Sequence, residues 1–479
     1  MESFYWYDLE TSGIDPRCDR IMQFAGQRTD LNLNPIADPD EFYGQLPADC
    51  LADPQACLIT GITPQYVAEH GLVEAELSRE IQRIFNQPQS CVVGFNSISF
   101  DDEFIRYLFY RNLTDPYARE WQNGNSRWDL LNLVRATHAL RPDGIKWPQQ
   151  DQRVSMRLEL LSAANGLAHE HAHDALSDVY ASIEMAKLIR SKQRRLFDYY
   201  FSLRAKSKVL ALIDLKKHQP LVHTAVYYGE ANGYTSLVMP IARSQHNANA
   251  IICYDLAKDP DELISVSADE LRARRFNEGF FALSQIAVNR CPMLAPVSVL
   301  DQRSAARLGL DLPQCRRHYD RLLQTPELST KVQSLFDGFD EDEIEDDCDL
   351  MLYSGGFFSD HDKKLMQACL QAPIESIAAQ QWEFEDSRLD EMLFRYRARN
   401  FPDTLSADER DVFAEYCWYA LCERGGEDLN DYFSLLSTLE QQLESASSET
   451  AKPETAKQKF ILAQLRQYAE NLVHQYGRA

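Results

Sequence analysis

Hydrophobic positions follow two different periods in the first 195 residues. Apolar strand-like runs occur at Phe4 to Leu9, Met22 to Gln27 and Cys91 to Phe95. Between and after them, apolar residues recur at helical spacing near residues 74–86, 101–112, 128–139, 157–165 and 174–195. Strands mixed with helices are typical of an α/β layer architecture. The pattern therefore predicts an α/β domain over residues 1–195.

The pattern changes twice further along the chain. Short β-type runs broken by Gly, Asn and Pro predict a small β barrel or sandwich, at Val222 to Tyr228, Ser236 to Ile241, Ala250 to Asp255 and Met293 to Leu300. After Gly355-Gly356 the spacing is helical, as at Leu389 to Arg399, Ala407 to Glu423 and Lys459 to Tyr476. Because single cores stop growing near ~250 to 300 residues, we expect three domains, at 1–195, 196–352 and 353–479. The segment 444–457, rich in Ser, Thr, Glu and Ala, predicts an exposed loop.

The net charge of −24 argues against a nucleic-acid partner, because phosphate binding depends on local Lys and Arg. The charge is unevenly placed, however. Residues 337–349 hold nine carboxylates, whereas residues 190–217 hold nine Lys and Arg against Asp198 and Asp214. Either run can be a solvated face or loop. The basic run gains meaning only if nearby chemistry needs a polyanion.

Composition also indicates where the protein works. Hydrophobic residues make up 44% of the chain, and no window approaches the 18 uninterrupted apolar residues of a membrane span. The first residues lack the basic and apolar regions of an export signal. The eleven cysteines include no CxxC pair, which fits a reducing compartment and argues against a zinc site. We expect a soluble cytoplasmic protein without a membrane partner.

The first candidate site residues are Asp8 and Glu10, at the end of the first apolar run. On a strand, positions i and i+2 share a face about 6.6 Å apart, so both carboxylates point the same way. Adjacent carboxylates repel each other unless a cation lies between them, and Mg²⁺ takes oxygen ligands. A lone Asp-x-Glu pair is also common at a solvent-exposed strand end, so the pair alone leaves both interpretations open.

The second candidate is Asp101, at the start of an expected helix whose apolar stripe comprises Phe104, Ile105, Leu108 and Phe109. At 100° per residue, Asp101 falls in the middle of that stripe, Asp102 at its edge and Glu103 on the outside. Acids in a first helical turn usually complement the helix dipole. Asp101 is the one predicted to point inward.

The third candidates are His173 and Asp178, near a helix that we expect to begin at Asp174, its N-cap. Its buried stripe would contain Ala175, Val179, Ile183 and Ala186. Asp178 lies on the border of that stripe, about 60° from its first residue. A histidine before a helix can equally be a capping or surface residue, so His173 is not decided by its position alone.

Together these residues form an ordered pattern: Asp-x-Glu on a first strand, Phe-Asp at a helix start, and His-x-Ala-x-x-Asp opening a late helix. The pattern resembles the DEDD superfamily of 3′-to-5′ exonucleases, in the branch whose fifth residue is His. Four other segments resemble bacterial exonuclease I: Ile59 to Thr63, Asn125 to Leu131, Arg195 to Tyr199 and Tyr396 to Pro402. The resemblance covers nearly the whole chain and fades at 337–349 and 444–457.

The resemblance implies a ribonuclease-H-like α/β exonuclease domain, an SH3-like β domain and an all-α C-terminal domain that together enclose single-stranded DNA. It implies a 3′-to-5′ exodeoxyribonuclease of DNA repair and recombination, which releases 5′-mononucleotides with two Mg²⁺ ions, or Mn²⁺. Asp8, Glu10 and Asp178 would hold the ion that activates water. Asp8 would bridge to the second ion, which Asp101 supports. His173 would act as the general base, because imidazole accepts protons at neutral pH.

Contacts with DNA and a protein partner are also expected. Aromatic rings stack on bases and cations follow the backbone, and the candidates are Phe100, Phe104, Trp128, Trp147, Arg395, Arg397 and Arg399. The rings can instead be core residues, and the arginines a solvated helix face. The family also binds the acidic C-terminal tail of single-stranded-DNA-binding protein, for which Arg157 and Lys206 to Lys208 are the candidate pocket, between the first two domains. We expect a monomer.

Two other interpretations stay open. An RNA-directed exonuclease of the same superfamily would use the same residues, but such enzymes are typically compact catalytic domains, and nearly 300 residues follow position 195 here. A non-catalytic single-strand-binding scaffold would keep the shape without the chemistry. All five catalytic residue types are present in order, which disfavours the scaffold.

Overall fold

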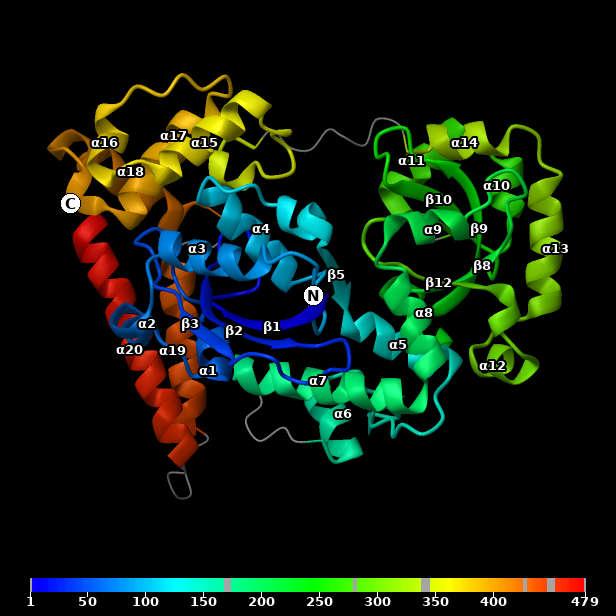
Figure 1. The fold of residues 1–479 in the computed structure, drawn as a ribbon. Coiled ribbons are helices and arrows are strands. Elements are labelled where there is room, and N and C mark those ends of the chain that lie inside the picture. The colour runs from blue at the N-terminus through cyan, green and yellow to red at the C-terminus, as the bar shows by residue number, and fades with distance from the viewer. Residues whose placement is uncertain are drawn as a thin grey trace.

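The chain forms three structural units side by side (Figure 1). The structure is a computed structural model that describes residues 2–167, 174–278, 282–336, 345–424, 429–445 and 453–477. An α/β unit lies in the middle, a β-rich unit on one side and a helical unit on the other. The predicted order of an α/β, a β and an all-α unit is confirmed.

The first unit is built on a five-stranded sheet in the order β3-β2-β1-β4-β5. Its strands are β1 (Ser3–Thr11), β2 (Ile21–Thr29), β3 (Asp40–Tyr43), β4 (Ser90–Gly94) and β5 (Ser126–Asp129). The central β1 runs antiparallel to β2 and parallel to β4. The three predicted strands are present. The edge strands β3 and β5 are too short to give an alternating pattern, and the sequence did not reveal them.

Helices cover both faces of this sheet, which is why β1 is apolar on both sides. Tyr5 and Tyr7 pack toward α3 (Glu74–Phe85) and α4 (Asp101–Arg111), while Phe4 and Trp6 pack toward α5 (Leu130–Leu140) and α7 (Ala175–Lys192). Figure 1 shows α7 along one face and α3 with α4 on the other. The remaining helices are α1 (Pro54–Thr60), α2 (Pro64–His70) and α6 (Leu158–Asn165), and a small hairpin joins β6 (Gln149–Gln150) to β7 (Arg153–Val154).

The second unit contains an antiparallel sheet in the order β11-β10-β9-β8-β12. Its strands are β8 (Leu221–Thr224), β9 (Thr235–Arg243), β10 (Ala250–Asp255), β11 (Leu283–Ala287) and β12 (Met293–Pro296). The surrounding helices were not predicted: α8 (Arg194–Ser202), α9 (Lys206–Leu212), α10 (Asp261–Ser265), α11 (Ala268–Glu278), α12 (Gln302–Arg307), α13 (Leu312–Leu323) and α14 (Leu328–Ser334). Two expected strands also end early, because 226–228 and 297–299 form short 3₁₀ turns.

The third unit is helical and packs back onto the first. It comprises α15 (Asp360–Gln371), α16 (Ile374–Ala379), α17 (Arg388–Asn400), α18 (Ala407–Cys422), α19 (Leu429–Ser445) and α20 (Pro453–Tyr476). Side chains of α19 and α20 share an apolar cluster with α1 and α2, and Thr63 donates a hydrogen bond to Gln464 at 2.7 Å. Half of the expected loop at 444–457, residues 446–452, lies outside the described residues. The other half does not form a loop, because 444–445 end α19 and 453–457 begin α20.

A buried ionic cluster joins the first and third units. Asp49 accepts hydrogen bonds from Arg20 at 3.1 Å and from Arg399 at 2.9 Å, and its side chain is fully buried. Arg395 binds Asp347 and Asp349, and its guanidinium lies over the Tyr416 ring. Burial opposes the charge of Asp49, but Arg399, Arg20 and Arg424 hold the pKa of its carboxyl below the ordinary value. The cluster is therefore charged and paired.

This cluster corrects one expectation from the sequence. Arg395, Arg397 and Arg399 are not a solvated basic face, because their side chains are only 9%, 8% and 2% exposed. Arg397 is paired with Glu409 at 2.9 Å. All three charges are thus satisfied internally by carboxylates. The predicted DNA-contacting face is therefore wrong for these three residues, which pair with buried or half-buried carboxylates instead.

Two further predictions bear on the chain as a whole. The eleven cysteines are all free thiols, and nine of them are buried, as expected for small apolar side chains. Among the described residues, no helix has both the length and the apolar character needed to cross a bilayer.

Candidate functional site

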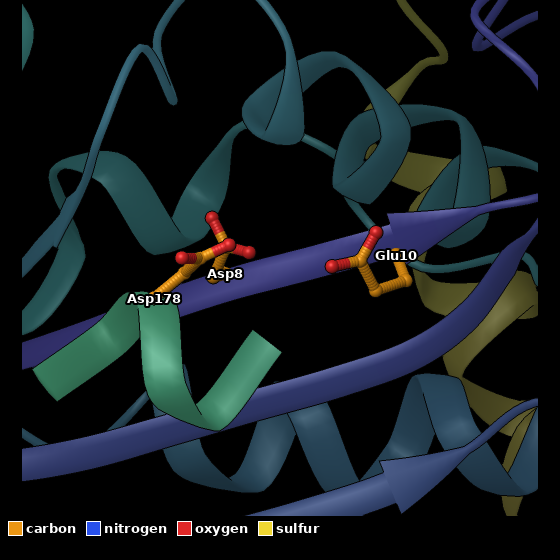
Figure 2. A group of neighbouring side chains, drawn as sticks. All are labelled: Asp8, Glu10 and Asp178. Atoms are coloured by element: carbon orange, nitrogen blue, oxygen red, sulfur yellow. The ribbon is translucent and has the colours of Figure 1, made fainter. Parts of the chain in front are cut away.

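Three carboxylates converge where β1 passes the start of α7. Asp8 and Glu10 come from alternate positions of β1, and Asp178 lies in the first turn of α7 (Figure 2). One carboxylate oxygen from each lies within 4.8 Å of the other two. We call these residues the acidic trio. The prediction that Asp8 and Glu10 share a face is confirmed.

The position of Asp178 depends on how α7 begins. Asp174 is the N-cap, as predicted, and its carboxylate accepts a hydrogen bond from the Ser177 backbone N–H at 3.2 Å. One turn later Asp178 faces the sheet, with its carboxylate turned toward Asp8 in Figure 2. His173 directly precedes this cap in sequence, but it lies outside the described residues.

The electrostatics of the acidic trio suit a cation. Burial, followed by the negative charges of Asp101, Asp178 and Glu10, raises the pKa of Asp8 well above its ordinary value. Burial and the neighbouring carboxylates raise the pKa of Glu10 to about 8. Such a group holds protons until a cation replaces them. An all-oxygen donor set fits a hard divalent ion such as Mg²⁺ or Mn²⁺.

Asp101 adds a fourth carboxylate from α4. The side chain is 3% exposed, so the prediction that it points inward is confirmed. Burial is the main cause that raises its pKa to about 8, and the charges of Asp102 and Asp129 contribute. Asp101 is not within the 4.8 Å set of the trio, although its charge is the largest carboxylate influence on the pKa of Asp8.

The acidic trio borders a cavity of about 410 Å³, within the usual range for a small-molecule site. Asp8 and Asp178 line one side, and the cationic side chains are Arg135 and Arg157. The rest of the wall consists of apolar side chains together with Asn96 and Glu159, and the apolar ones are Phe95, Leu131, Met156 and Leu158. The cavity therefore combines carboxylates for metal, cations for phosphate and an apolar surface for a base or sugar.

Comparison with known proteins decides the family. Residues 5–186 match the family model described as Exonuclease, residues 204–338 the Exonuclease I SH3-like domain, and residues 346–472 the Exonuclease I C-terminal domain. Exodeoxyribonuclease I of Escherichia coli K12 is 40% identical, over 99% of this chain and 98% of its own length. The Haemophilus influenzae exodeoxyribonuclease I is 43% identical, over 86% of this chain and 89% of its own length. The chain belongs to the exonuclease I family.

Solved exonuclease I structures share the whole fold. The alignment with each of the three structures below covers 99% of this chain and 100% of the solved chain. The E. coli enzyme with a dA16 oligonucleotide gives a TM-score of 0.92 at 40% identity. A complex of single-stranded-DNA-binding protein and exonuclease I with an inhibitor gives 0.91 at 40%. The zinc-bound form of the E. coli complex with single-stranded DNA gives 0.91 at 39%.

Within this family fold, the expected stacking residues divide into two groups. Phe104 is 1% and Trp128 is 0% exposed, and Trp128 makes edge-on contacts with Phe197 and Phe201. A covered ring offers no face to a base, so the prediction is wrong for these two residues. Phe100 is only partly buried and stays a candidate for stacking on a base. Its ring centroid lies 5.0 Å from that of Phe104. The Trp147 ring packs against the His138 ring, and the two ring centroids are 4.8 Å apart.

The residues expected to bind a partner tail lie at the start of α6 and on α9. Arg157 lines the cavity of the acidic trio, where its side chain is 60% exposed and paired with Glu159. Neither Lys206 nor Lys208 lines that cavity, and both lie exposed on α9 of the SH3-like unit. Arg157 therefore lies at the cavity of the acidic trio, and its role in partner binding stays a prediction.

Sequence reasoning missed three residues near the site. Asp102 is 1% exposed and is held by Arg127 at 2.8 Å and by the Tyr7 hydroxyl at 2.7 Å, which fixes the start of α4 beside Asp101. Asn96 lines the cavity with a positive φ of 68°, a conformation that Asn tolerates. Arg135 lines it from α5. Asn96 follows the buried strand β4 and Asp102 lies at the edge of the apolar stripe of α4, so both had a local signal, whereas Arg135 had none.

Proposed function

We propose that this chain removes 5′-mononucleotides from the 3′ end of single-stranded DNA. The observation that carries the proposal is the acidic trio beside a cavity that also holds two arginines. Membership of a family of exodeoxyribonucleases supports it, as does the full-length likeness to an enzyme solved with a DNA oligonucleotide. The second and third units would confine the strand, which favours DNA with a free single-stranded end over a duplex.

The acidic side chains have distinct roles in this proposal. Asp8, Glu10 and Asp178 would hold one divalent ion, and Asp8 with Asp101 would hold a second. When bound, two ions stabilise both the attacking and the leaving oxygen of a phosphodiester. Mg²⁺ is the proposed ion and Mn²⁺ a substitute. Without cations the trio relieves its mutual repulsion by holding protons, and a bound metal ion would replace those protons.

Side chains outside the acidic set would bind the strand, and one of them, His173, would accept a proton. His173 would accept a proton from the attacking water, because it precedes Asp174 and therefore the helix that carries Asp178. Arg157 and Arg135 would contact phosphate oxygens from the cavity wall. Met156 and Leu131 would exclude water beside the terminal nucleotide. Phe100 is the proposed stacking residue of the catalytic unit.

Product analysis tests the proposal. A 5′-labelled single strand should shorten stepwise in Mg²⁺, release 5′-mononucleotides and stay intact in EDTA. A 3′-terminal block and a blunt duplex should both resist digestion. Rapid release of the 5′ label as a mononucleotide would contradict the polarity. Faster cleavage of a matched RNA strand would favour the RNA-directed alternative, and binding without any Mg²⁺-dependent cleavage would favour the scaffold.

We also propose a partner and a setting. Single-stranded-DNA-binding protein has been solved with exonuclease I, and its acidic tail would need exposed cations such as Lys206 and Lys208. A labelled tail peptide should bind in low salt and weaken as salt rises, because exposed charge pairs are screened over about 8 Å. Equal affinity for wild type and Lys206→Ala/Lys208→Ala would exclude the lysines. The proposed setting is DNA repair and recombination by a cytoplasmic monomer, and free thiols fit that compartment.

A further inference from the structure

A second cavity of about 490 Å³ lies between the first unit, which carries the acidic trio and is called the catalytic unit, and the second unit, which is called the SH3-like unit. Met156 lines this cavity and also the cavity of the acidic trio, so the two are adjacent. His138 lies on the catalytic side and Tyr234 on the SH3-like side. The Arg153–Glu230 pair, 3.8 Å apart, belongs to the same lining, and Arg153 is 77% exposed. An exposed pair of this kind contributes little stability and can open.

Tyr234 is held in an unusual conformation at the boundary of the two cavities. Its φ is 58°, in the left-handed region that bulky residues seldom adopt. A tight turn maintains it: the Tyr234 N–H donates to the Gly229 carbonyl at 2.9 Å, and the Ala225 N–H donates to the Tyr234 carbonyl at 2.7 Å. Backbone strain of this kind persists where the surrounding structure enforces it, often at ligand contacts.

The Tyr234 ring faces a cation from the catalytic unit. The Arg135 guanidinium lies 5.4 Å from the ring centroid, and Arg135 itself lines the cavity of the acidic trio. The ring and the guanidinium therefore connect the two cavities across the domain boundary. Flat aromatic and guanidinium groups are the surfaces on which unpaired bases stack.

Unused polar atoms accompany this pair. Arg135 Nε and His138 Nδ1 are both buried, and neither has a hydrogen-bond partner among the residues that the structure describes. Burial lowers the pKa of His138 to about 4, so the imidazole is neutral and can offer one donor and one acceptor. Buried polar atoms usually have partners, and a base edge would provide them.

We propose that the second cavity is a nucleobase subsite, in which Tyr234 stacks on one base of the strand on the 5′ side of the nucleotide beside the acidic trio. The base would also meet His138, and its phosphate would lie toward Arg135. The inference rests on the proposed function, because it assumes that a single strand reaches the trio. It assigns Tyr234 to one defined position along the strand.

An abasic scan in a binding assay tests the subsite. The catalytically impaired Asp178→Asn protein is titrated with short labelled strands that carry one abasic residue at successive positions from the 3′ end. Base–aromatic stacking typically contributes a factor of about 5 to 150 in affinity. One position should therefore weaken binding by a factor in that range, with smaller effects at its neighbours. A flat profile overturns the proposal.

Substitution of Tyr234 links that position to the ring. Tyr234→Asn removes the ring but tolerates the left-handed backbone, so the turn is preserved. It should weaken binding of the intact strand by a similar factor and make binding insensitive to the abasic residue at the sensitive position. Tyr234→Phe should restore wild-type behaviour. The matched control is Tyr227→Asn, the same change at a 54% exposed ring outside the cavity. Equal sensitivity in wild type and Tyr234→Asn overturns the proposal.

A hydrolysis assay separates this proposal from the proposed function. In active protein, Tyr234→Asn should reduce kcat/KM for a strand more than for p-nitrophenyl thymidine 5′-phosphate, which reaches only the first cavity. If wild type hydrolyses neither compound, the proposed function fails, while the abasic scan still supports or overturns the subsite. If both compounds are hydrolysed with equal losses in Tyr234→Asn, the function stands and the subsite is overturned.

Discussion

Asp178→Asn should make the metal-free protein more stable while it abolishes hydrolysis. The trio places carboxylate oxygens within 4.8 Å of one another, and two unit charges at that distance repel by about 3.5 kcal/mol at an effective dielectric constant near ~20. Partial protonation lowers the gain, because the pKa of Glu10 is already raised to about 8. We expect a net increase of about 1 to 3 kcal/mol in the free energy of unfolding at pH 8.5 in EDTA.

The effect should depend on pH and metal with a definite sign. A carboxyl whose folded pKa is raised contributes stability below its unfolded pKa and loses it as pH rises through the folded value. For Glu10 that window runs from about 4.5 to about 8, so the advantage of Asp178→Asn should shrink as pH falls. Mg²⁺ at 100 times its dissociation constant would stabilise wild type by about 2.7 kcal/mol. In Mg²⁺, wild type should therefore be more stable than Asp178→Asn.

Urea unfolding followed by tryptophan fluorescence, in EDTA and in Mg²⁺, measures both effects. The control is Glu184→Gln, which removes an acid from the same helix at a site that is 41% exposed and paired with Lys187 at 2.7 Å. The control should match wild type in both conditions. An Asp178→Asn protein that is no more stable than wild type in EDTA, and that gains as much from Mg²⁺, would refute the assignment of the trio.

Three further predictions follow from the remaining features. His173→Ala should slow single-turnover hydrolysis by about 10² to 10⁴, and a loss of less than twofold would exclude it as the base. Asp49→Ala should lower the free energy of urea unfolding by about 3 to 5 kcal/mol, because it leaves buried arginines without a partner. The control Glu80→Ala, in an exposed pair, should lower it by less than ~1 kcal/mol. Since the Asp49 pKa is lowered, the stability that Asp49 contributes should be lost as pH falls below about 4. Arg395→Ala should destabilise the protein but leave the salt dependence of DNA binding unchanged, whereas loss of a true phosphate contact would reduce that slope by about 1.

Local periodicity accounts for the parts of the site that could be predicted. Alternation on β1 places Asp8 and Glu10 on one face, and the helical angle correctly directs Asp101 inward. The same reasoning identifies Asp174 as a cap, which then positions Asp178. These residues lie within a few positions of the pattern that reveals them, so the sequence alone was sufficient.

Long-range partners account for the failures. Nothing near Arg399 indicates that it will pair with Asp49, which is 350 residues away, and so a buried ion pair resembled a basic face. Trp128 lies in β5, a short edge strand that the pattern did not reveal, and its burial was therefore not predicted. Arg157 is separated from the trio in sequence, and only the folded chain brings it to the same cavity.

The packing of α20 against α1 and α2 has a consequence for synthesis of the chain. Thr63 and Gln464, which share a hydrogen bond, are 401 residues apart. At roughly 5 to 20 residues per second, the ribosome would need about 20 to 80 s to supply the second after the first. During that interval the apolar surface around Cys57 and Val67 has no cover from α19 and α20. We therefore expect the nascent N-terminal unit to bind a chaperone until the last helix emerges.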